Sequence, residues 1–152
     1  MSKTQPVLHD CPLARATRLL GDRWTLLILR DIMFGGRRTY RALLRQSPEG
    51  IASSILSARL KRMMSEGLLT RAEDTDAEGR QPYALTERAI ALLPVLAELS
   101  AWALDGPPTP ADIRTRLVVG GGPKLWAALQ AELRDDHLRG VLPDLSIKTR
   151  LW

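Results

Sequence analysis

Cysteine and histidine are nearly absent from the sequence, which has one cysteine, Cys11, and two histidines, His9 and His137. A single cysteine excludes a framework of intrachain disulfide bonds and suits a reducing compartment, so we expect a cytoplasmic protein. Two histidines and one cysteine cannot by themselves supply the four ligands of a structural zinc site. We therefore predict no metal site.

Long apolar runs and common catalytic motifs are also missing. No run reaches the length of about 18 apolar residues that would span a membrane. The opening residues MSKTQPVLHD lack the apolar core and cleavage site of a secretion signal. There is no GxxxxGK[ST] loop and no GxSxG motif, and Gly120–Gly122 are more typical of a flexible joint than of a phosphate loop. We predict no membrane segment, no enzyme activity and no cofactor.

Basic residues, in contrast, are in excess. The formal net charge is +5 and the sequence pI is about 10.0. The excess is concentrated between Arg37 and Arg62, where seven basic residues accompany a single acid, Glu49. Such a stretch is compatible with nucleic-acid binding, but also with an ordinary solvated basic face.

Apolar spacing predicts four helices before Gly67, which is placed to end the fourth as a C-terminal glycine. Asp10 is a candidate N-cap for a helix that begins near Pro12, and Thr39 for the third helix. The second, RWTLLILRDIMF, is apolar nearly all round and should be central to the core. The third and fourth helices are expected at roughly Thr39–Arg45 and Ala52–Glu66.

The pattern then changes to that of strands. LLTRAE and RQPYALT flank the turn-rich, acidic DTDAEG, which predicts a β-hairpin, and a long helix is expected from Thr86 to about Leu104. Asp105–Pro110 is the clearest linker, and two further helical segments follow it, separated by the glycines. The fold class is therefore mainly α with a small β-hairpin wing: a winged helix-turn-helix with a C-terminal helical extension.

The predicted fourth helix has two different sides. Leu56, Leu60 and Met63 fall on the apolar side, and Ile55 and Met64 lie at its margin. The opposite side has Ser54, Ser57, Ala58, Lys61 and Arg62. Small residues let a helix approach base edges in a major groove about 12 Å wide, while lysine and arginine reach phosphates. In a helix-turn-helix, the second helix of the pair lies in the major groove and the first helix braces it across the DNA backbone. Because the predicted fourth helix is the second of such a pair, we predict double-stranded DNA as the partner.

The sequence also resembles that of the HxlR-type regulators, which are relatives of the MarR group. The resemblance lies in the Cys-Pro pair, GDRWTLLILRDI, GRRTYRALLR, LSARLKRM, EGLL and YALTE, in that order, and covers about Cys11 to Trp102. It implies a bacterial, DNA-binding transcriptional regulator. It also implies a homodimer, joined through the first helix and the helix after the wing, on a palindromic operator.

The resemblance also suggests site residues. It places Arg38 and Tyr40 near phosphates and Arg80 on the wing, whereas the acidic wing tip should stay out of the minor groove. The predicted DNA-binding residues are Arg38, Thr39, Tyr40, Ser53, Ser54, Ser57, Ala58, Lys61, Arg62, Arg71 and Arg80. The predicted division of the chain is 1–10 as an N-terminal arm, 11–105 as the DNA-binding domain and 106–152 as an extension for accessory dimerisation or effector binding.

Two residues are candidates for regulation. Cys11 lies at a helix start with Arg15 one turn later, which favours the reactive thiolate, and some members of the resembled family sense oxidants or electrophiles here. The alternative is a small packed side chain without a signalling role. Trp24 is a candidate for an effector pocket, although core packing is the more common role of a tryptophan beside LLIL.

The rival functional class is a winged-helix interaction module, whose basic face would bind an acidic protein. The small side chains on the fourth helix favour DNA over that partner. The salt dependence of binding to random duplex DNA distinguishes the two classes.

Overall fold

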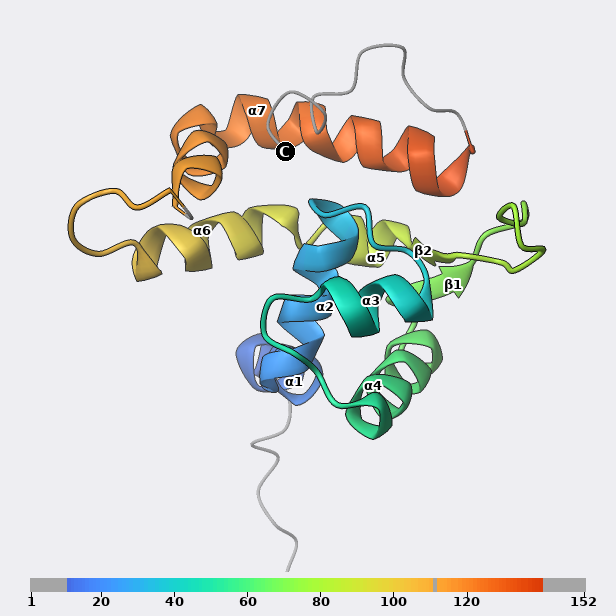
Figure 1. Cartoon of the computed structure of the whole chain (residues 1–152). Coiled ribbons are helices and arrows are strands. Elements are labelled where there is room, and N and C mark those ends of the chain that lie inside the picture. Colours follow the sequence, from blue (N-terminus) through green and yellow to red (C-terminus); the bar gives the residue numbers. More distant parts are fainter. Residues whose placement is uncertain (1–10, 111, 141–152) are drawn as a thin grey trace, which may run out of the picture.

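The computed structural model describes residues 11–110 and 112–140. Figure 1 shows three tiers: the first four helices lie below, α5 and α6 cross the middle, and α7 covers them from above. The elements are α1 (Pro12–Leu20), α2 (Arg23–Met33), α3 (Tyr40–Gln46), α4 (Ser53–Ser65), β1 (Leu69–Arg71), β2 (Tyr83–Leu85), α5 (Glu87–Ile90), α6 (Leu93–Ala103) and α7 (Ile113–Leu138). This order confirms the predicted winged helix-turn-helix with a helical extension.

Side-chain caps explain where several helices begin. Asp22 accepts hydrogen bonds from the backbone N–H groups of Trp24 and Thr25, both at 3.1 Å, and so starts α2. Thr39 starts α3 by accepting from the N–H of Ala42 at 3.1 Å, as predicted. The N-cap position of α1 is Cys11 without a side-chain cap, and the predicted cap Asp10 lies outside the described residues.

The core is built around α2, as the sequence predicted. Leu29, Ile32 and Met33 are fully buried there, together with Leu56 of α4 and Leu85 of β2. Because α2 is apolar on most sides, the other helices can pack around it. This core also fixes the orientation of α4, since the apolar side of that helix must face it and the opposite side must then face outward.

A turn of known geometry joins α4 to the wing. Gly67 has φ +72°, and the N–H groups of Gly67 and Leu68 donate to the carbonyl oxygens of Met64 and Met63 at 3.1 and 2.8 Å. This is a Schellman ending, which requires a residue that tolerates positive φ. The chain then enters the antiparallel pair β1–β2, in which Leu69 is opposite Leu85 and Arg71 is opposite Tyr83.

The predicted helix from Thr86 to Leu104 is wrong as a single helix. Thr86 does cap a helix, by accepting from the N–H of Ala89 at 3.3 Å, but α5 ends at Ile90 and α6 begins at Leu93. Pro94 is the cause, because its ring has no N–H and would collide with the carbonyl of residue 90 in a continuous helix. At the start of α6 the same proline is well tolerated.

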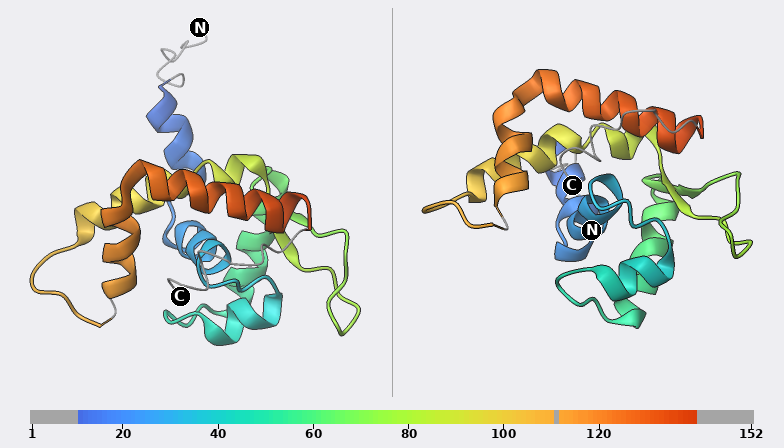
Figure 2. Two further views of the ribbon diagram at one scale, coloured as in Figure 1. Left: turned by 90° about the horizontal axis from the view of Figure 1, so that it is seen from above. Right: turned by 45° about the horizontal axis from the view of Figure 1, so that its top comes forward.

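The extension forms one long, kinked helix. The kink in α7 is at Gly122, with φ 59° and ψ −162°, so the predicted division at the glycines is confirmed. Buried Trp126 spans the kink by donating from its indole N–H to the carbonyl of Val118 at 2.7 Å. Figure 2 shows α7 lying along α5 and α6, and it also contacts β2.

Among the described residues, no helix combines the length and apolar character needed to cross a membrane. The same part of the chain contains no group of three or more His, Cys, Asp or Glu side chains that could hold a metal ion.

Candidate nucleic-acid interface

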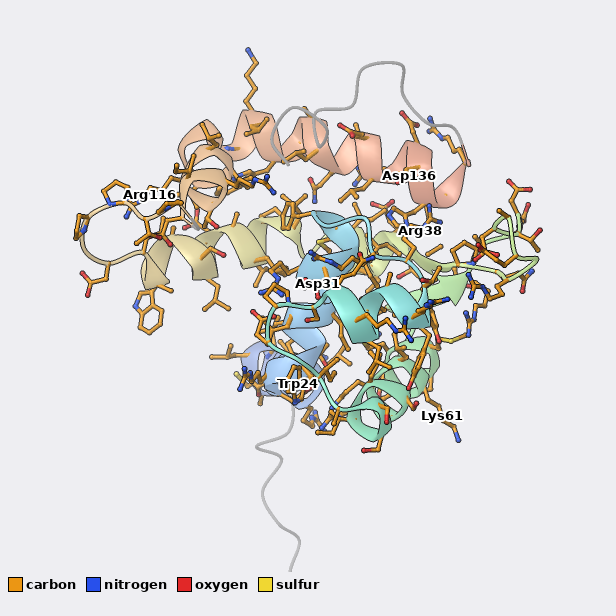
Figure 3. The ribbon with its side chains drawn as sticks, viewed as in Figure 1. Trp24, Asp31, Arg38, Lys61, Arg116 and Asp136 are labelled. Carbon is orange, nitrogen blue, oxygen red and sulfur yellow. The ribbon has the colours of Figure 1, made fainter. Side chains whose placement is uncertain are left out.

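One side of α4 is open to solvent. Its exposed residues are Ser53, Ser54, Ser57, Ala58 and Lys61. On the opposite side Leu56, Leu60 and Met63 are 0%, 2% and 1% exposed. Figure 3 shows Lys61 pointing away from the body of the molecule at the end opposite to Asp136 of α7. The described part of the extension therefore leaves this surface uncovered.

Polar contacts fix α4 against its neighbours. The hydroxyl of Tyr40 on α3 donates to the carbonyl of Ser53 at 3.1 Å and lies 3.2 Å from the hydroxyl of Ser57, which donates to it. Arg59 pairs with Asp22, the cap of α2, at 3.2 Å. Two different helices thus hold the start and the middle of α4, which gives the exposed side a fixed position.

Arg62 has a role that the sequence did not indicate. It is half-buried, and its guanidinium donates to the carbonyl of Arg18 in the last turns of α1. A cation near a helix C-terminus also interacts favourably with the helix dipole. Arg62 therefore joins α1 to α4, whereas Lys61 is the exposed cation of this surface.

A network of ion pairs holds the turn between α3 and α4. Arg30 forms two hydrogen bonds to Glu49, at 2.6 and 2.7 Å, and also donates to Asp31, which is 1% exposed. Arg37 donates to Asp31 at 3.1 Å. The hydrogen bonds from Arg30 are the main cause that lowers the pKa of Glu49 to about 2. Glu49 and Arg37, which sequence analysis counted only as charges, therefore have structural roles.

Arg38, which the resemblance places near phosphates, makes its contacts within the chain. Its guanidinium donates to Asp136 of α7 at 2.9 Å and to the carbonyl of Tyr83 at 3.0 Å, and its side chain is only 20% exposed. The two residues of this ion pair are 98 positions apart, so no local pattern could have indicated it. Arg38 connects the extension to the wing, and we leave it out of the proposed DNA surface.

The base of the wing is basic, and its tip is acidic, as predicted. The Arg71 guanidinium lies 3.8 Å from the centre of the Tyr83 ring and donates to the tyrosine hydroxyl. Arg80 pairs with Asp76 at 3.0 Å and with Glu78 at 2.8 Å. Hydrogen bonds from the backbone and side chain of Arg80 help to lower the pKa of Asp76. Both arginines are thus held in defined positions at the exposed surface.

Arg41 is a basic residue of this region that was not among the predicted DNA-binding residues. It is exposed on α3, and it lines a hollow of about 590 Å³. The other residues that line the hollow are Thr39, Tyr40, Arg71, Arg80 and Gln81. The available signal was its spacing of four residues from Arg45, which puts both on the outward side of a short helix.

The two candidates for regulation differ in exposure. Cys11 is exposed at the start of α1, where the backbone N–H groups of Ala14 and Leu13 lower the pKa of its thiol. Trp24 packs against the core, half-buried, with the Arg23 guanidinium 4.8 Å from the centre of its ring. The exposed thiol is available to reagents, whereas most of the Trp24 side chain contributes to packing.

A buried central helix, a helix pair with one open small-residue side, and a two-stranded wing define the winged helix-turn-helix class of transcription factors. The sequence model of the HxlR-like helix-turn-helix proteins matches residues 19–107, more than half of the chain. The chain belongs to the HxlR-like helix-turn-helix family.

Similar proteins carry the same description. The HTH-type transcriptional regulator Rv3095 of Mycobacterium tuberculosis is 38% identical over 96 residues, which are 63% of this chain and 59% of that protein. The chain thus matches less than two thirds of that relative's length. YvaP of Bacillus subtilis, described in the same words, is 31% identical over 62% of this chain and 87% of its own. These descriptions agree with the prediction of a transcriptional regulator.

Two solved structures share the fold. PA1607, a candidate transcription factor, superposes with a TM-score of 0.57 and 31% identity over 68% of this chain and 70% of its own. The reduced form of the transcriptional regulator YodB from B. subtilis superposes with a TM-score of 0.52 and 31% identity. That match covers 61% of this chain and 90% of YodB.

Proposed function

We propose that this protein is a transcriptional regulator that binds double-stranded DNA as a homodimer, on an operator with two symmetric half-sites. The observation that carries the proposal is the open side of α4, where Ser54, Ser57 and Lys61 are exposed while the opposite side is buried. Membership of the HxlR-like family supports the same function.

The chemistry of this surface suits a major groove. Hydroxyl groups of serine donate to or accept from several base edges, and the Ala58 methyl group can contact a thymine methyl. Lys61 can reach a phosphate beside the groove, and each neutralised phosphate releases counterions. We therefore assign the base contacts to the serines and the non-specific affinity to the surrounding cations.

The test is the salt dependence of binding by the full chain. Its affinity for a random duplex should fall steeply as salt increases, with a slope of about −0.9 for each phosphate contacted. Selection from random duplexes should then enrich a palindromic site. Weak binding with no such slope, together with binding to an acidic protein, would favour the interaction-module alternative and overturn the proposal.

Exposed apolar side chains on α1 and α6 support the homodimer. Leu13 is 70% exposed on α1, which projects from the body of the molecule in the left view of Figure 2. On α6, Val95, Leu99 and Trp102 are 48%, 46% and 85% exposed. Their spacing of four and three residues puts them on one side of the helix. A second copy would cover both apolar surfaces.

Cys11 is our candidate for the switch. Its exposure and the lowered pKa of its thiol favour reaction with oxidants or electrophiles. Because Cys11 is the N-cap residue of α1, its modification would alter the packing of the proposed dimer and so the spacing of the two α4 helices.

The switch is tested by operator affinity with and without diamide. Diamide should weaken operator binding of the wild type severalfold and leave a Cys11→Ser variant unchanged. Because Cys11 is the single cysteine of the chain, an equal response of both proteins would rule it out as the sensor.

A small-molecule effector is the other proposed input. A cavity of about 60 Å³ lies between α2, α6 and α7, lined in part by Phe34, Ser100 and Thr115. This volume suits about two water molecules, so a larger effector would have to separate α7 from α6. Trp24, the candidate named from the sequence, would take part only after its packing against the core is loosened.

A further inference from the structure

The hollow between the start of α3 and the base of the wing has the features of an anion-binding site. It measures about 590 Å³ and is lined by Thr39, Tyr40, Arg41, Arg71, Arg80 and Gln81. Three of these six residues are arginines and none is acidic. A second hollow of about 470 Å³, between the wing and the end of α7, differs because acids balance its three arginines: its charged lining residues are Arg38, Arg71, Arg139, Glu73, Asp74 and Asp136.

The three guanidinium groups differ in how much hydrogen-bonding capacity they retain. Arg71 donates to the Gln81 carbonyl and the Tyr83 hydroxyl, and Arg80 donates to Asp76 and Glu78. A guanidinium has five N–H donors, so both keep donors for a further acceptor. Arg41 is exposed, and within the described part of the chain its guanidinium makes no hydrogen bond or ion pair. Arg41 is therefore the uncompensated cation of the hollow.

The hollow is continuous with the proposed base-contacting surface. Tyr40 lines the hollow, and its hydroxyl contacts both Ser53 and Ser57 on α4. A DNA strand that borders the groove occupied by α4 would leave it past Tyr40, toward the base of the wing. The group that such a strand presents there is a phosphodiester, for which arginine is the preferred partner.

We propose that this hollow binds a backbone phosphate of the duplex, with Arg41 supplying the free guanidinium, so that the wing contacts DNA at its base. Arg71 and Arg80 complete the site from the wing, in positions fixed by Tyr83 and Asp76. The acidic tip, with Glu73, Asp74 and Glu78, then stays outside the duplex. This inference rests on the proposed function, and it adds the location of one phosphate contact and the residue, Arg41, that makes it.

The test compares three single variants of the full chain on the selected operator and on random duplex. Arg41→Gln should weaken binding to both about tenfold, as expected for one charge-assisted hydrogen bond, and reduce the salt slope by about one unit. Arg45→Gln is the matched control, because Arg45 is exposed on the same helix but does not line the hollow. Equal losses for Arg41→Gln and Arg45→Gln would mean general electrostatics and would overturn the site.

Neutral methylphosphonates placed one at a time in the operator identify the contact directly. A methylphosphonate at one position in each half-site should weaken operator binding by the wild type and cause no further loss of binding in the Arg41→Gln variant. Lys61→Gln separates the inference from the function on which it rests. If Lys61→Gln flattens the salt slope and Arg41→Gln does not, the hollow is not a phosphate site although the function stands. If the wild type shows no salt-dependent duplex binding, both fail.

Discussion

Glu49 is the single acid in the most basic stretch of the chain, and its pairing with Arg30 explains its presence. The turn between α3 and α4 must hold the two helices at a fixed angle, and Gly50, with φ +65°, gives it no side chain to pack. The bidentate contact from Arg30 on α2 anchors that turn to the core helix. One ion pair thus helps to fix the orientation of α4, the helix that we propose contacts DNA.

The Arg30–Glu49 pair should make stability depend on pH. The pKa of Glu49 falls from an ordinary 4.5 to about 2 on folding, so its contribution is fully present above the unfolded value and is lost as pH falls from 4.5 toward 2. After allowance for solvent, since the side chains are 31% and 23% exposed, we expect about 2 kcal/mol near neutrality.

Urea denaturation of a Glu49→Gln variant at several pH values measures the contribution of the Arg30–Glu49 pair to the free energy of unfolding. The variant should be less stable than the wild type near neutrality, and the difference should shrink at pH about 3. Glu73→Gln, a change of the same charge on the exposed wing, serves as the control. A stability difference that stays constant with pH would contradict the lowered pKa of Glu49.

At the scale of elements, α7 is attached to the wing and not merely laid over α6. Asp136 binds Arg38, and the buried His137 accepts a hydrogen bond at Nδ1 from the backbone N–H of Leu85 in β2, at 3.1 Å. Arg134 adds two-pronged contacts to Glu87 of α5. The extension thus contacts the strand that leads out of the wing, so a change in α7 can alter the position of the wing.

Two neighbouring aspartates of α7 should differ sharply in their effect on stability. Asp136 is 11% exposed and pairs with Arg38, whereas Asp135 is 38% exposed and pairs with Arg139 one turn away. Asp136→Asn should cost about 2 kcal/mol, since it leaves a half-buried guanidinium without its charged partner. Asp135→Asn should change stability by less than about 0.5 kcal/mol. Urea midpoints of both variants test this, and equal values would mean that the Arg38–Asp136 contact contributes little.

Local patterns in the sequence predicted most elements, and long-range contacts were beyond them. Spacing within one or two turns indicated the cap Thr39, the helix start at Thr86, the glycine at 67 and the two sides of α4. Pro94 is the local signal for the break between α5 and α6, because its ring clashes with the preceding turn of a continuous helix. The partner of Arg38, in contrast, depends on how α7 folds back over the wing, which no local periodicity encodes.

At the scale of the whole molecule, the proposed DNA and dimer surfaces lie on different parts of the fold. The open side of α4 points away from α7 in Figure 3, and the exposed apolar residues lie on α1 and α6. Two copies joined through α1 and α6 would each keep α4 free. A two-fold arrangement places the α4 helices about one DNA turn apart when both enter the same side of a duplex. In the proposed dimer, the arrangement of the two copies would determine which spacing of half-sites is bound.

Trp102 is the residue on which the dimer is tested, because it is the most exposed large apolar side chain of the described chain at 85%. Wild type should have twice the chain mass of 16.9 kDa in light scattering. Trp102→Glu should weaken association by at least about 2 kcal/mol, about thirtyfold, because aromatic anchors dominate interfaces. Leu138→Glu, at 47% exposed on α7, introduces the same charge away from this surface and should leave the mass unchanged. Because the Trp102→Glu variant should dimerise less, its affinity for the operator should also fall. A wild type that is monomeric and still selects a palindromic site would show that dimerisation through α6 is not needed.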